Sequence, residues 1–167
     1  LENDEIPAIT TPYFNFFELD VLCRMGKLTE VLDKIRSYWG GMLDLGAVTF
    51  WEEYDPSVPK EEQYDMYGDH FGKSLCHAWA ASPIYFLAKY FAGLDLVNKD
   101  GVTYILKPKM QYFTELDCTL PVGSNGVVRL VWDGEILEIT PNADGGILEL
   151  GEQKLSLVRG ETRRVKI

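Results

Sequence analysis

A loop between residues 46 and 73 gathers most of the side chains that could do chemistry in this chain. It contains the run Trp51-Glu52-Glu53 and other acidic and aromatic residues, and His77 follows shortly after it. Aromatic rings bind the apolar C–H faces of sugars, and glycoside hydrolysis needs two carboxyl groups, one as acid and one as base or nucleophile. The residue types therefore fit a sugar site, and they also fit an acidic, solvated loop held by buried aromatic anchors.

The sequence has no regular pattern of metal ligands. Asp55, Asp65 and Asp69 are spaced too irregularly for a defined calcium loop. The three cysteines are far apart and lack the paired spacing of a zinc site, so we expect free thiols. His70 belongs to no recognisable motif. We therefore expect no metal and no cofactor, and the cysteines leave the cellular compartment open.

Composition excludes two classes of partner. The chain has 167 residues, is 46% hydrophobic, and carries a net charge of −10. Nucleic acids and anionic membrane surfaces attract basic faces, so neither is an expected partner. The longest apolar runs fall short of the roughly 18 residues that a membrane span needs, and no signal peptide is visible. The length allows one or two domains with packed cores.

Helical periodicity dominates up to about Gly93. A first helix is expected to begin at Thr11-Pro12, since Thr is a good N-cap and Pro is favoured at the first helical position, and to end at Gly26. Its apolar residues cover most of its circumference, which predicts burial on nearly all sides. A second, amphipathic helix is expected over residues 28–45.

A third helical segment is expected over residues 74–93 and is again apolar nearly all round. Pro83 should kink this helix, or Ser82-Pro83 should start a new one. Alternating inner and outer helices are typical of a layered helical toroid. Three helices cannot cover two fully apolar ones, so we expect either self-association or a place in a larger domain.

The remainder of the chain alternates with period two and has turn signals between short segments. This pattern predicts an antiparallel β-sandwich, with residues 94–101 as a hinge. The predicted fold class is α+β, with a helical part over residues 1–95 and a β-sandwich over residues 96–167. The expected strands are 102–106, 112–118, 127–131, 136–139, 147–150, 154–157 and 162–167.

An ordered series of short motifs extends over roughly residues 8–160: GAVTFWE, SLCHAWAASP, YFAGL, KPKM, GVVRLVW and LEITPNADGGILELG. The series resembles the C-terminal end of the α-L-rhamnosidase family of glycoside hydrolases. The resemblance implies a six-hairpin helical toroid followed by a β-sandwich, and an inverting mechanism. Residues 1–95 would then be the last helices of an incomplete toroid.

The resemblance also implies roles for single residues. Glu52 matches the general base that activates water, and His77 matches a residue that contacts the bound rhamnose. Glu53 has no role in the family pattern. Trp51 is a candidate for substrate binding, although packing under the loop is its favoured role, and Trp79 is expected in the core. Without the resemblance, His77 would be interpreted as a satisfied histidine near a helix start.

The family's general acid lies earlier in its chain, in a stretch that has no counterpart here. A full toroid needs twelve helices, and about three are present. We therefore expect a C-terminal fragment that carries the base, lacks the acid and is inactive alone. Its partners would be a rhamnose-containing saccharide, the missing N-terminal part of the toroid and further copies of the chain. The alternative is a non-catalytic carbohydrate-binding or structural buttress module.

Overall fold

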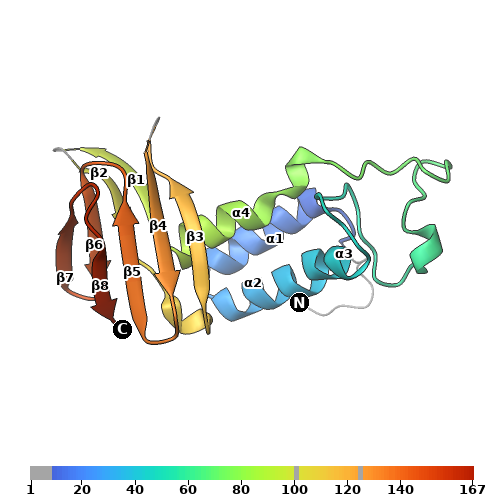
Figure 1. Cartoon of the computed structure of the whole chain (residues 1–167). Coiled ribbons are helices and arrows are strands. Elements are labelled where there is room, and N and C mark those ends of the chain that lie inside the picture. The colour runs from blue at the N-terminus through green and yellow to red at the C-terminus, as the bar shows by residue number, and fades with distance from the viewer. Residues whose placement is uncertain (1–8, 100–101, 124–125) are drawn as a thin grey trace. The chain divides into compact units, whose positions relative to one another are not determined.

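The computed structural model describes residues 9–99, 102–123 and 126–167. The chain divides into two compact units, Leu1–Tyr85 and Phe86–Ile167. Helices make up most of the regular structure of the first unit and strands that of the second (Figure 1). This arrangement confirms the α+β fold class predicted from the sequence. The interpretation of the two parts as the end of a toroid and a separate sandwich domain stays a prediction.

The helices begin and end close to the local signals in the sequence. Pro12 opens α1 directly after Thr11, and Gly26 follows its end with a left-handed backbone. The second expected helix is one continuous run, whose middle turn is π-helical. The helical elements are α1 (Pro12–Arg24), α2 (Leu28–Lys34), a π-helix (Ile35–Trp39), α3 (Gly40–Asp44), two 3-10 helices (Lys60–Glu62 and Ala78–Ala80), α4 (Ser82–Phe86) and a second π-helix (Leu87–Phe91).

The third helix begins later than predicted. Residues 74–81 are not α-helical, and α4 starts at Ser82 with Pro83 in its first turn. Proline is tolerated there because the first helical N–H groups have no partner within the helix. Of the two alternatives for Ser82-Pro83, the start of a new helix is therefore confirmed. The prediction of a helix over residues 74–81 was wrong.

Helix α1 is buried on one side only. It runs beside α2 (Figure 1), and Leu19 and Leu22 are buried, as are Leu28 and Val31 of α2. The predicted burial on nearly all sides was wrong for this chain. A second stripe is exposed, and we call it the outer face of α1: Tyr13, Phe14, Phe17 and Val21 of the helix, and Met25 directly after its end.

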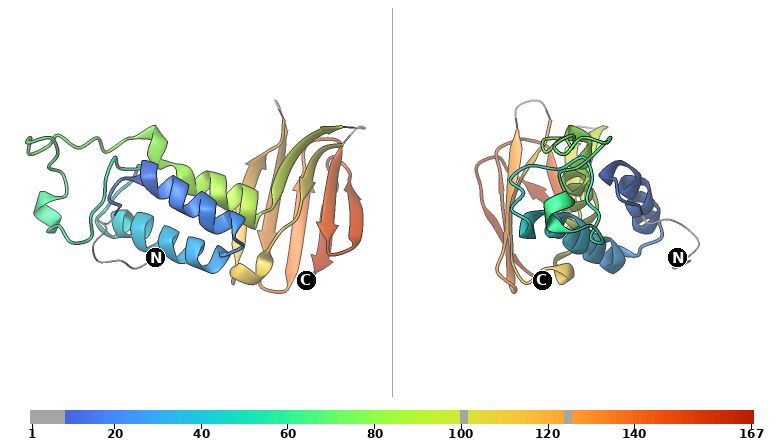
Figure 2. Two further views of the ribbon diagram at one scale, coloured as in Figure 1. Left: turned by 180° about the vertical axis from the view of Figure 1, so that it is seen from behind. Right: turned by 90° about the vertical axis from the view of Figure 1, so that its right-hand side faces the viewer.

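In the part of the chain that the structure describes, eight strands form two four-stranded sheets, which Figure 2 shows as two layers. The orders are β1-β2-β6-β7 and β3-β4-β5-β8. Neighbouring strands are antiparallel except β2 and β6, which run parallel. The strands are β1 (Leu94–Lys99), β2 (Val102–Leu106), β3 (Leu116–Pro121), β4 (Val127–Trp132), β5 (Ile136–Pro141), β6 (Gly146–Leu150), β7 (Gln153–Leu157) and β8 (Arg163–Lys166).

The core of the second unit lies between these sheets and confirms the sandwich. Tyr104 and Leu148 of one sheet and Leu130 and Ile139 of the other are fully buried in one cluster. Burial of each such leucine or isoleucine contributes about 2 kcal/mol. Residues 94–101 were expected to be a hinge, but most of them form β1, which pairs with β2 at the edge of its sheet.

Candidate functional site

The loop after α3 begins with a firm helix stop. Gly46 has a left-handed backbone (φ 93°). The Gly46 N–H donates to the Leu43 carbonyl at 2.8 Å, and the Ala47 N–H donates to the Met42 carbonyl at 3.0 Å. These two bonds satisfy carbonyls at the helix end in a Schellman motif, which fixes the direction in which the chain leaves α3.

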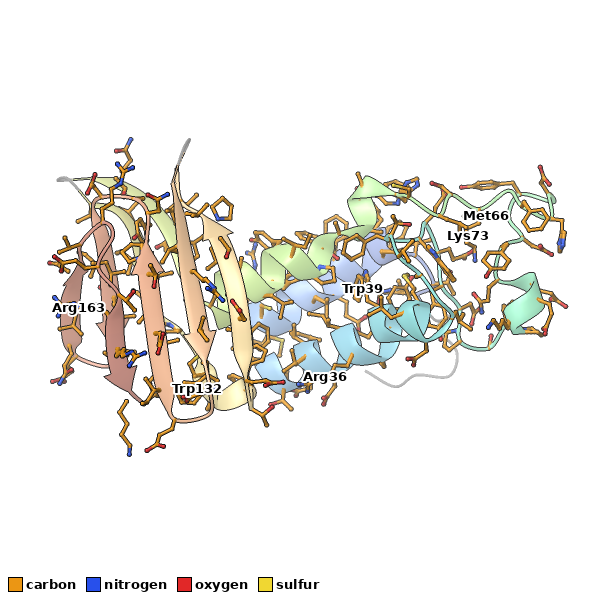
Figure 3. All side chains as sticks on the ribbon, viewed as in Figure 1. Arg36, Trp39, Met66, Lys73, Trp132 and Arg163 are labelled. Carbon is orange, nitrogen blue, oxygen red and sulfur yellow. The ribbon has the colours of Figure 1, made fainter. Side chains whose placement is uncertain are left out.

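Two segments of chain run side by side at the candidate site. The Glu52 N–H donates to the Ser74 carbonyl at 2.9 Å, and the His77 N–H donates to the Phe50 carbonyl at 2.8 Å. Nearby, the buried Trp39 indole donates to the Ala80 carbonyl at 2.8 Å, and Figure 3 shows Trp39 among the helices. Backbone and side-chain bonds therefore hold Glu52 and His77 in fixed register.

The Glu52 carboxylate has a donor on each oxygen. Only 8% of the residue is exposed. The Ser74 N–H donates to Oε2 at 3.1 Å, and the Tyr67 hydroxyl donates to Oε1 at 3.0 Å. His77 Nδ1 lies 3.9 Å from Oε2. The structure thus brings together the predicted base and the predicted sugar contact.

Glu53 is bound in a different set of contacts from Glu52. The Thr10 hydroxyl donates to Glu53 Oε1 at 2.7 Å, and Lys73 Nζ lies 3.8 Å from Oε2. Lys73 is buried, and this burial lowers the pKa of its ammonium group, an effect that Glu53 and other acids partly oppose. Figure 3 labels Lys73 on the loop. These contacts give Glu53 a supporting role in loop structure.

Trp51 lies under the loop. It is 3% exposed, and its ring meets Tyr64 edge to face at 5.7 Å between centroids. So little of its surface is free that the packing role is the better supported one. Substrate binding by Trp51 stays a prediction.

Trp79 is not in the core, contrary to the prediction. It is 48% exposed, because residues 78–80 form a short 3-10 helix and not part of a long buried helix. Its ring lies 4.4 Å from the His77 ring and 5.1 Å from the Tyr13 ring. An exposed aromatic surface therefore adjoins His77, and no periodic pattern in the sequence indicated it.

His70 and the loop acids make separate local contacts. His70 Nδ1 lies 2.6 Å from Asp65 Oδ1, and both side chains are largely exposed. Hydrogen bonds from the Ser57 hydroxyl and the Ser57 N–H lower the pKa of the Asp55 carboxyl group.

Within residues 9–99, 102–123 and 126–167, no group of three His, Cys, Asp or Glu side chains is arranged to hold a metal ion. In the same described ranges, no helix combines the length and the apolar character needed to cross a membrane.

The arrangement suits general-base chemistry. A carboxylate held by two donors keeps a defined orientation, and a neighbouring imidazole and exposed aromatic rings can bind hydroxyls and apolar faces. The sequence predicted no role for Tyr67, Ser74 or Lys73. The Tyr67-Gly68 pair between Asp65 and Asp69 was the available turn signal for the first of these residues.

The fold and site define a helical unit with a buried, oriented carboxylate, followed by a two-sheet sandwich. No family model matches the chain, and no curated protein matches it. Among solved structures, the crystal structure of a GH78 family rhamnosidase of Bacillus sp. GL1 is similar, with a TM-score of 0.62 and 24% sequence identity. The likeness covers 86% of this chain and 15% of that chain, so it concerns a small part of the rhamnosidase. It shows a shared fold.

Proposed function

We propose that this chain belongs to an inverting α-L-rhamnosidase-like glycoside hydrolase, in which Glu52 is the general base that activates water. The observation that carries the proposal is the Glu52 carboxylate, buried and held on both oxygens, with His77 Nδ1 3.9 Å away. A base must keep one orientation toward the water that it deprotonates, and this geometry provides it. The shared fold with part of a GH78 rhamnosidase supports the same substrate class, a terminal α-L-rhamnose.

His77 is proposed to contact the sugar. Its side chain is 27% exposed, and its ring contacts the ring of the half-exposed Trp79, with 4.4 Å between centroids. A partly exposed imidazole beside an aromatic ring suits a molecule that presents both hydroxyls and apolar faces.

The general acid is proposed to lie in another part of the longer protein. The neighbouring carboxylate, Glu53, is already bound to Thr10 and Lys73 and is therefore a poor candidate for this role. The inverting mechanism places the two carboxyl groups roughly 6.5–9.5 Å apart.

The rest of the toroid is proposed to cover the outer face of α1. Phe14, Phe17 and Val21 repeat at helical spacing and are more than half exposed. An apolar stripe of this kind is rare on a protein that acts alone. In this proposal residues 1–95 are the last helices of a toroid and residues 96–167 its C-terminal sandwich. The isolated chain is expected to self-associate through this face, which sedimentation velocity would detect.

The decisive experiment is Glu52→Gln in the longer protein, assayed with an aryl α-L-rhamnoside. Loss of a general base lowers kcat by about 100-fold or more. The neighbouring Glu53→Gln variant is the matched comparison, and its rate is expected to fall less than tenfold, as for a residue that acts through loop structure. The 167-residue chain alone is expected to hydrolyse nothing. Near-normal hydrolysis by Glu52→Gln would refute the assignment, and calorimetry with rhamnose would then test the binding-module alternative.

A further inference from the structure

Tyr67 has an unusual backbone. Its φ is 55°, and it is the only non-glycine residue with positive φ in the part of the chain that the structure describes. The left-handed region is unfavourable for residues with a Cβ, especially bulky ones. Such conformations persist where the surrounding structure enforces them, and they cluster at functional sites.

The surrounding turn enforces this conformation. The Met66 N–H donates to the Asp69 carbonyl at 3.0 Å, and the Asp69 N–H donates to the Met66 carbonyl at 2.9 Å. Gly68 follows with its own left-handed φ of 81°. Gly72 approaches so closely that a Cβ there would lie 2.3 Å from the Met66 carbonyl oxygen. The paired bonds between Met66 and Asp69 and the close approach of Gly72 thus hold Tyr67 in its left-handed conformation.

Packing does not explain why a tyrosine occupies this position. The Tyr67 residue is 80% exposed, so its ring gains little from burial. Its polar contact is the 3.0 Å bond from its hydroxyl to Glu52 Oε1. A glycine or asparagine would fit the backbone better, but neither could reach Glu52 from here with a hydroxyl.

We infer that Tyr67 is a positioning residue for Glu52: its hydroxyl holds Oε1 while the Ser74 N–H holds Oε2, and together they aim the carboxylate at the attacking water. This inference rests on the proposed function. The hydrogen bond to Glu52 raises the pKa of Tyr67, so its hydroxyl stays protonated and remains a donor through the neutral range.

The environment of Glu52 makes the role measurable. The titratable and charged groups around Glu52 are Tyr67, His77, Lys73 and Glu53. Tyr67 is the one that donates directly to the carboxylate in the described contacts. A carboxylate that loses one of its donors is less firmly oriented, so removal of the Tyr67 hydroxyl should change both the rate that depends on Glu52 and the chemical environment of its carboxyl group.

The first test is Tyr67→Phe in the longer protein. We expect kcat/KM on an aryl rhamnoside to fall about threefold to tenfold through kcat, with KM little changed, because the lost hydrogen bond orients Glu52 and does not bind the sugar. Tyr64→Phe is the matched control, because no hydrogen bond from the Tyr64 hydroxyl is found among the described residues. The control should keep kcat/KM close to the wild-type value.

The second test does not depend on activity. Carbon NMR of the 167-residue chain at neutral pH should give a Glu52 carboxyl chemical shift in Tyr67→Phe that differs from the shift in wild type and in Tyr64→Phe, because one hydrogen-bond donor to that carboxyl has been removed. Circular dichroism confirms that each variant is folded. Equal chemical shifts in all three proteins would overturn the role of Tyr67. Normal hydrolysis by Glu52→Gln would instead overturn the proposed function, and the NMR result would still decide whether Tyr67 holds Glu52.

Discussion

Two adjacent glycines in α3 allow a sharp test of how the helix meets the loop that carries Glu52. A Cβ on Gly40 would meet nothing within 4 Å, whereas a Cβ on Gly41 would lie 2.4 Å from the Tyr54 hydroxyl oxygen and 2.5 Å from the adjoining ring carbon. Both residues have helical backbones within one continuous helix. Alanine at either position therefore gains the same helix propensity, and only one of them collides.

The magnitudes follow from these distances. Replacing a helical glycine by alanine stabilises a helix by about 0.8–1 kcal/mol. Gly40→Ala should gain about this amount. Ordinary carbon contacts are about 3.5–4 Å, so Gly41→Ala must push the Tyr54 ring by about 1 Å. The Tyr54 ring packs on Tyr38 at 5.6 Å, which resists this movement. Overpacking of this kind costs about 1–3 kcal/mol, so Gly41→Ala should range from neutral to about 2 kcal/mol less stable.

Urea unfolding followed by far-UV circular dichroism measures both variants. The quantity to compare is the difference between their free energies of unfolding, expected at about 1–3 kcal/mol. A Tyr54→Leu background should remove most of this difference, because the ring that collides is gone and the two changes are then non-additive. Equal stability of Gly40→Ala and Gly41→Ala would refute the close approach of loop and helix.

Two further predictions concern the sandwich. Gly93→Ala should lower the free energy of unfolding in urea by about 3 kcal/mol or more, because φ is 70° and the new Cβ would lie 2.1 Å from the Lys107 carbonyl oxygen. Gly160 is also left-handed but has open space around it, so Gly160→Ala should lower this free energy by only about 1 kcal/mol. Hydrogen bonds from Lys107 and Lys154 lower the pKa of Glu149 in the folded protein. The contribution of Glu149 to stability is therefore complete above the usual carboxyl pKa of about 4.3, and it is lost as the pH falls through the lower pKa of the folded state. Wild type should therefore exceed Glu149→Gln in stability at pH 7, and the difference should vanish in strong acid; a constant difference from pH 7 to about pH 2 would contradict this.

Local signals predicted those elements whose ends depend on their own residues. Pro12 and Gly26 marked the ends of α1 because proline at the first helical position and a left-handed glycine are local effects, although the Thr11 side chain makes no capping hydrogen bond. Residues 74–81 were wrongly predicted as helix, since their apolar pattern was overridden by backbone bonds to residues 50–52. The strand β1 was missed for a related reason: its pairing with β2 is what makes it a strand.

The candidate site likewise contains residues that the sequence indicated and residues that only the tertiary structure brings together. The proposed roles of Glu52 and His77 came from a resemblance, and no spacing rule could have placed the two side chains 3.9 Å apart. Thr10 and Lys73 contact Glu53 from distant positions in the sequence, so their roles depend on the tertiary structure. Tyr67 combined both difficulties, because its contact with Glu52 requires a backbone conformation that tyrosine rarely adopts.

The parallel pairing of β2 with β6 has a kinetic consequence. Strands β3, β4 and β5 follow one another as antiparallel neighbours, so their contacts close short loops. Tyr104 of β2 instead pairs with Gly146 of β6, which closes a loop of about 40 residues and costs about 2 kcal/mol more entropy than closing a four-residue turn. Long-range pairing of this kind slows folding. The meander of β3, β4 and β5 can therefore form early. The other sheet is completed later, when β6 and β7 pair with β2.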